Sequence, residues 1–192
     1  MNQYEIAARS VYLLAQAVSY RSHEEISAGA QHPQERAMKA DYLLGLLDEW
    51  RVNLTPHFRP LPLGPAVGSP FAPVWISPAV LGSAVQMCDL ARVLLLVQKP
   101  NITDYADMHT REKEISAAID ELCGIAMTVS EETATMNSIG CLRALSIFVR
   151  DPGKRDAVVG LLQRHKNQTG FPLHDVETEL RNRWAEIDLK VP

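Results

Sequence analysis

Basic residues are not in excess in this chain, and cysteine is scarce. The 192 residues include 19 Lys and Arg against 23 Asp and Glu, a formal net charge of -4 at pH 7. Gripping the phosphates of nucleic acid requires clustered Lys and Arg, so we expect no direct nucleic-acid binding by this chain. The three cysteines, Cys88, Cys123 and Cys141, are too few for a disulfide framework, and thiols within apolar segments suit a reducing compartment.

The usual motifs of catalysis and metal binding are also missing. No two of the 6 histidines have the i, i+4 spacing of a helical metal pair, and there is no Cys-x-x-Cys. The sequence has neither a Gly-rich phosphate loop nor a Gly-x-Ser-x-Gly elbow. We therefore expect no catalytic residues, no metal site and no cofactor, and we do not expect an enzyme. The opening residues, MNQYEIAARS, predict no signal peptide.

One long apolar segment could be a membrane span or a buried helix of a soluble domain. Between Val80 and Val97 the only charged residues are Asp89 and Arg92, and both lie near the middle. Each charge there would cost about 2.5–3.5 kcal/mol on membrane insertion. We favour a buried helix at 78–98, with Ser77 as its N-cap, and we expect no membrane association.

The hydrophobic periodicity predicts an all-α fold, and no segment alternates with the period of a strand. The composition, 46% hydrophobic and 22% charged, is that of a globular chain, and we expect one irregular helical domain over residues 1–192. Thr128 to Glu131 resembles a capping box, and Asp151 and Gly170 match helix boundaries. About seven helices are predicted, at residues 3–21, 33–51, 78–98, 108–127, 130–149, 152–167 and 174–188.

A proline-rich segment separates the second and third predicted helices. Residues 53–76 contain six of the 12 prolines, which excludes a helix and a central strand. The segment also carries apolar side chains that gain by burial, so we expect an ordered surface crossing with turns at Gly64 and Gly68. A flexible linker between two domains is the alternative.

The order of several short motifs resembles the C-terminal part of the fungal-specific transcription factor domain. That domain is the regulatory region of fungal binuclear zinc cluster transcription factors. The resemblance covers roughly residues 35–185. It consists of LLDEW at 46–50, PVWISP at 73–78, QMCDLARVLLLVQKP at 86–100, ELCGIA at 121–126, RDAVVGLLQRHKNQTGFP at 155–172 and LRNRW at 180–184.

This resemblance implies a regulatory domain in the nucleus that controls a metabolic or secondary-metabolite gene set. Regulation would proceed through a small-molecule effector or a protein partner, and a homo- or hetero-oligomer with a full-length regulator is one option. The family's DNA-binding module, six closely spaced cysteines holding two zinc ions, is missing from these residues. The alternative is a small helical enzyme or ligand-binding protein of an unrecognised family.

Six residues are candidate contacts for an effector or partner. Four lie in the proline-rich segment and two on the helix that follows it. Packing and capping are an equally good interpretation for each of them. The candidates are Phe58, Arg59, Phe71, Trp75, Asp89 and Arg92. We further expect the guanidinium of Arg92 to reach a carboxylate or a helix C-terminus, because its donors need partners in an apolar helix.

Overall fold

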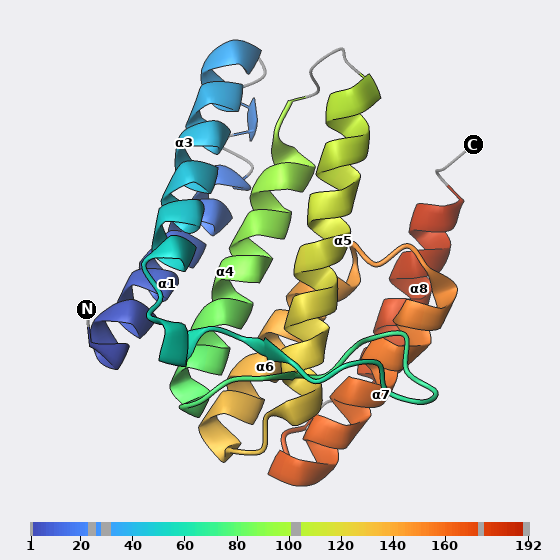
Figure 1. Cartoon of the computed structure of the whole chain (residues 1–192). Coiled ribbons are helices and arrows are strands. Elements are labelled where there is room, and N and C mark those ends of the chain that lie inside the picture. Colours follow the sequence, from blue (N-terminus) through green and yellow to red (C-terminus); the bar gives the residue numbers. More distant parts are fainter. Residues whose placement is uncertain (1, 23–25, 28–31, 101–104, 173–174, 190–192) are drawn as a thin grey trace.

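The computed structural model describes residues 2–22, 26–27, 32–100, 105–172 and 175–189. Over these residues the fold is all-α, as predicted, and Figure 1 shows the helices packed as a bundle. Seven helices of 13 to 24 residues are present: α1 Gln3–Tyr20, α3 Pro33–Val52, α4 Ala79–Gln98, α5 Tyr105–Thr128, α6 Glu132–Ser146, α7 Pro152–Thr169 and α8 Val176–Asp188. One core of buried apolar side chains runs from Ile6 in α1 to Trp184 in α8.

Helix α4 is the centre of the bundle. It contacts α1, α3, α5 and α6, and 13 of its 20 residues are buried. Among the described residues it is the one helix long and apolar enough to cross a membrane, and 72% of its most apolar window is buried inside the protein. The predicted packing of this helix on most sides is confirmed.

Two helix boundaries were predicted correctly and two were wrong. Asp151 caps α7 by accepting a hydrogen bond from the Lys154 backbone N–H at 2.8 Å, and Gly170 ends that helix in the left-handed region. The residue at the N-cap of α4 is Pro78, so Ser77 lies outside the helix. The capping box is wrong because α5 continues through Thr128, whose hydroxyl instead donates to a carbonyl of the proline-rich segment.

The proline-rich segment folds against α5. After the 3-10 turn η1 (Pro56–Phe58), strand β1 (Leu61–Pro62) pairs antiparallel with β2 (Val74–Trp75). The chain reverses where Gly64 and Gly68 adopt positive φ angles of 85° and 77°, as the predicted turns require. Figure 1 shows the segment crossing α5, which agrees with the predicted surface crossing.

Gly124 in α5 allows this close contact. A Cβ atom at position 124 would lie 2.4 Å from the carbonyl oxygen of Ala72 and 2.8 Å from a methyl group of Val74. Gly140, in the middle of α6, has no neighbour within 4 Å of the equivalent point. Substituting alanine at each of these two glycines therefore distinguishes the effect of helix propensity on stability, which both positions share, from the effect of the steric contact, which only Gly124 has.

Gly124→Ala should lower the free energy of unfolding by about 1–3 kcal/mol, the usual penalty of overpacking, because a backbone carbonyl cannot move aside cheaply. Gly140→Ala should raise the free energy of unfolding by up to about 1 kcal/mol, since alanine is the better helix former. Urea denaturation of both variants measures the difference. Equal stabilisation by the two substitutions would show that the segment does not pack on α5 as described.

Candidate functional site

The four candidate residues of the proline-rich segment lie in different environments. Phe71 is buried in the core, and Phe58 is half-buried against it. Arg59 is exposed, and its Nε donates to the carbonyl oxygen of Leu54 at 3.4 Å. Trp75 is 50% exposed and lines a cavity of about 170 Å³ beside Ile76. These four residues therefore do not form one binding surface.

The two candidates on α4 have separate ion-pair partners on α3. Arg92 pairs with Asp48, which confirms the prediction that its guanidinium reaches a carboxylate. Asp89 is only 4% exposed and lies 3.5 Å from Arg51, which also pairs with Glu121 of α5. Burial, and then the nearby Glu121 carboxylate, raises the pKa of Asp89 well above its usual value. The ion pairs of Arg51 with Asp89 and Glu121 thus link α3, α4 and α5. Asp89 itself is too deeply buried to contact a ligand.

A chain of polar side chains crosses the core between α4, α6 and α7. Gln86 Nε2 donates to Ser138 Oγ at 3.0 Å, and Ser138 Oγ lies 3.2 Å from His165 Nε2. His165 Nδ1 lies 3.3 Å from Gln168 Oε1, which favours the tautomer with its proton on Nδ1. Ser138 and His165 are fully buried, and burial lowers the pKa of His165. Because this Ser–His pair is shielded from solvent, a substrate cannot reach it, and its hydrogen bonds stabilise the core.

The cysteines behave as core residues. Cys88, Cys123 and Cys141 are free and buried. Burial raises the pKa of all three thiols, to about 12 for Cys141, so none is an activated thiolate. The described part of the chain also contains no group of three or more His, Cys, Asp or Glu side chains suited to hold a metal ion.

A groove of about 520 Å³ lies between α5, the α6–α7 connection, α7 and α8. In Figure 1 the α6–α7 connection passes between α5 and α8. Aliphatic side chains from four parts of the sequence line this groove: Val97, Ile115, Ile119, Ile147, Val149 and Ile187. Its volume falls within the range of roughly 300–1,000 Å³ that is typical of sites for small organic molecules.

Three cations surround this groove, and each has a carboxylate partner. Arg155 makes a bidentate pair with Asp188 at 2.6 and 2.8 Å, and its Nε donates to the Val149 carbonyl oxygen. Lys154 Nζ lies 2.5 Å from Asp120 and 5.9 Å from the ring centroid of Phe71. These two cations are therefore fixed in place.

The third cation, Arg150, is the one best placed to meet a ligand. Its side chain is 86% exposed, and in the described part of the chain it pairs with the exposed Glu112 at 3.4 Å. Exposed ion pairs contribute at most about 1 kcal/mol, so Arg150 can exchange Glu112 for an acceptor on a bound molecule. The groove therefore has an aliphatic lining, and the guanidinium of Arg150 at its edge can form an ion pair with a bound molecule in place of Glu112.

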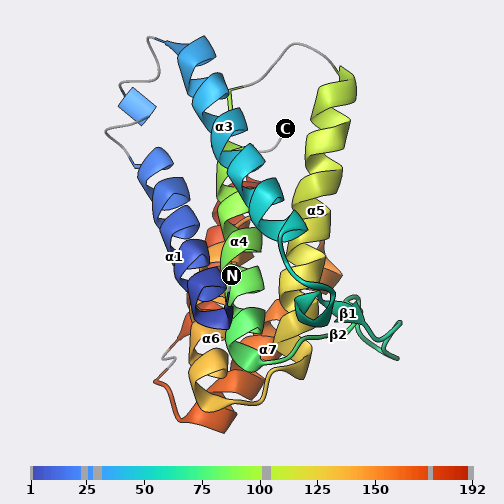
Figure 2. The same ribbon diagram turned by 60° about the vertical axis from the view of Figure 1, so that its left-hand side comes forward.

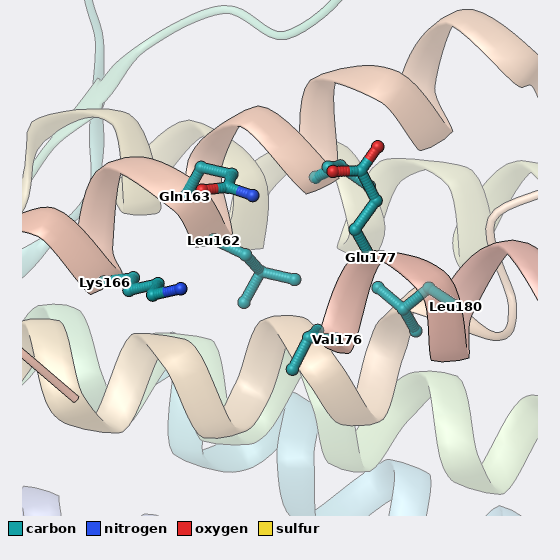
Figure 3. Close-up of a pocket in the computed structure, with 7 residues that line it drawn as sticks. Leu162, Gln163, Lys166, Val176, Glu177 and Leu180 are labelled. Carbon is teal, nitrogen blue, oxygen red and sulfur yellow. The ribbon is translucent and has the colours of Figure 1, made fainter. Parts of the chain in front are cut away.

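A second depression, between α7 and α8, is too small for a ligand. Figure 3 shows Leu162, Gln163, Lys166, Val176, Glu177 and Leu180 around it, and its volume is about 20 Å³. That space is close to the size of one water molecule. The larger groove is the better candidate site.

The sequence did not reveal the groove residues as site residues. Ile115 and Ile119 have the spacing of a core face, and that spacing does not say how completely neighbouring helices cover the face.

A comparison with family models, with curated proteins and with solved structures gives no match to this chain. The family therefore stays a prediction based on the sequence motifs.

Proposed function

We propose that the chain is a transcription-regulatory domain that binds a small, largely aliphatic effector in the α5–α8 groove and does not itself bind DNA. The groove is the observation that carries the effector part of this proposal. The order of motifs over residues 35–185 supports the regulatory part. The nuclear location and the metabolic gene set belong to the same proposal.

The mechanism would be a shift between two packing arrangements. Residues of α5, the α6–α7 connection, α7 and α8 line the groove, so a ligand there contacts several helices at once. A ligand changes the population of a conformation only if it binds one conformation better than another. An effector held by Ile115, Ile119 and Ile187 would stabilise the arrangement that closes these helices together, and a transcription partner would recognise that arrangement.

The alternative is a helical enzyme or a carrier of small molecules. An enzyme needs a reactive group that its substrate can reach, and Ser138, His165 and the three cysteines are buried. A carrier would use the same groove as a regulator. Transcriptional output, which a carrier does not produce, separates these two functions.

Ile115→Trp should weaken binding of decanoate, an aliphatic chain with one carboxylate, by about tenfold or more, because the indole fills the groove. Isothermal titration calorimetry measures the affinity. Met108→Trp, an exposed position on the same helix outside the groove, is the matched control and should bind as the wild type does. Equal affinity of the Ile115→Trp variant and the wild type would place the ligand elsewhere.

Arg150→Glu tests the edge of the groove. It should weaken binding of decanoate and leave binding of the uncharged decanol unchanged, because only the carboxylate uses the guanidinium. The same titrations compare the two ligands. A parallel loss for both ligands would mean that Arg150 supports the groove without recognising a charged head group.

A further inference from the structure

Helix α1 has two apolar faces, and only one of them packs on the bundle. The buried face consists of Ile6, Ser10, Leu13, Ala17 and Tyr20. Eight residues of α1 are exposed, and only Glu5 among them is charged. The exposed residues are Tyr4, Glu5, Ala8, Val11, Tyr12, Ala15, Val18 and Ser19. A helix face turned to solvent normally carries several charges, so an apolar exposed face indicates an interaction surface.

Five of the exposed residues form one straight stripe, which we call the outer stripe: Tyr4, Ala8, Val11, Ala15 and Val18. Their spacing of 4, 3, 4 and 3 residues is that of a coiled-coil seam. Large and small side chains alternate along it. Tyr4 is 70% exposed and Val11 is 52% exposed, so these side chains are uncovered in the isolated chain.

The position of α1 leaves room for another helix. Figure 2 shows α1 at the edge of the bundle, with α4 and α3 to one side of it. Ala8 and Val11 of the outer stripe also line a depression of about 430 Å³ between α1, α4 and α6, whose other lining residues include Ala134, Met87 and Glu131. On the other flank, Arg9 of α1 pairs with Glu49 of α3 at 3.2 Å and is therefore already neutralised.

The outer stripe fits a copy of itself running in the opposite direction. In a register that places Ala8 opposite Val11 of the other copy, Tyr4 lies opposite Ala15 of that copy. These two kinds of pair each combine one alanine with one larger side chain, so the two helices can approach closely between Tyr4 and Ala15. Val18 lies beyond the paired residues. No residue of the stripe is charged, so the two identical surfaces do not repel each other.

We infer that the outer stripe of α1 is a homodimer interface in which two copies of α1 pack antiparallel. The interface is isologous, as the symmetry of a two-fold dimer requires. One helix face is small compared with the roughly 800 Å² per partner of a standard interface, so the dimer is weak and reversible. This inference does not depend on the proposed effector site.

Sedimentation equilibrium of the full chain tests the inference. The wild type should change from monomer to dimer as its concentration rises to about a hundred micromolar, as expected for a weak interface. Val11→Asp should remain monomeric, because the contact would bury two unpaired carboxylates. Met108→Asp, which introduces the same charge at an exposed apolar position of α5, should dimerise as the wild type does. A monomeric wild type, or a dimer that survives Val11→Asp, would overturn the inference.

A mixing experiment tests the register. Val11→Lys and Ala8→Glu should each be monomeric alone, and an equimolar mixture should form a heterodimer because the lysine of one chain meets the glutamate of the other. Circular dichroism verifies that each variant is helical, as expected for substitutions on an exposed helix face. Failure of the mixture to dimerise, when both single variants have lost self-association, would overturn the antiparallel arrangement.

Discussion

Replacing Leu95 by aspartate is expected to abolish the cooperative unfolding transition of the protein. Leu95 is 1% exposed in the central helix α4. Burying an unpaired carboxylate there costs several kcal/mol even after the group takes up a proton, and the lost leucine packing adds roughly 2–5 kcal/mol. The sum approaches or exceeds the total stability of a domain, about 5–15 kcal/mol. Thermal unfolding followed by circular dichroism measures the effect, and Leu94→Asp should behave in the same way.

Val97→Asp is the matched control on the same helix. Val97 is 38% exposed near the end of α4, so a carboxylate at this position remains hydrated and the fold should persist. A cooperative transition of Leu95→Asp within a few degrees of the wild type would contradict the packing of α4. Loss of the fold by the Val97 variant as well would mean that the whole helix, including its end, tolerates no charge.

Removing Arg51 is expected to cause the second-largest loss of stability. Arg51 pairs with both Asp89 and Glu121, so its removal leaves these two carboxyl groups close together without a counter-charge. Breaking a buried pair from one side costs roughly 3–5 kcal/mol, and partial exposure of Arg51 places Arg51→Met at about the lower end of that range. Urea denaturation at neutral pH measures the change. In an Asp89→Asn background the same substitution should be clearly less destabilising, and equal losses in both backgrounds would show that the two residues are not coupled.

The raised pKa of Asp89 predicts a definite pH dependence. The folded state holds the Asp89 proton more tightly than the unfolded state, so this group stabilises the fold below its unfolded pKa. That contribution disappears as the pH rises through the folded-state pKa. The stability of the wild type relative to Asp89→Asn should therefore rise as the solution is acidified from neutral pH toward the ordinary range of a carboxyl. A relative stability that falls on acidification would mean that Arg51 lowers the pKa of Asp89 more than burial raises it.

The sequence predicted the helices well because their signals are local. Three-and-four spacing located all seven helices, and Asp151 and Gly170 marked the two ends of α7 through their own backbone preferences. The predicted start of α6 failed for a non-local reason. Thr128 has a suitable side chain for a cap, and a long-range hydrogen bond to the Val74 carbonyl oxygen uses its hydroxyl instead.

The surfaces were harder to predict than the helices. The apolar Val18 of the first helix is 54% exposed on the outer stripe. When a helix carries apolar residues on two faces, its sequence does not show which face packs against the core of the domain. The partner of Asp89 was missed for a similar reason, since Arg51 is 38 residues away and only the packing of α3 on α4 brings the two together.

Transcription from a reporter gene tests the central proposal most directly. The chain is fused to an unrelated DNA-binding domain and expressed in a fungal cell, and reporter output is compared with that of the DNA-binding domain alone. The proposal predicts that the fused wild-type chain changes reporter output, and that Ile115→Trp, which fills the groove, alters this change while Met108→Trp does not. Output equal to that of the DNA-binding domain alone, from a fusion that is folded and present in the nucleus, would contradict the assignment of a regulatory function.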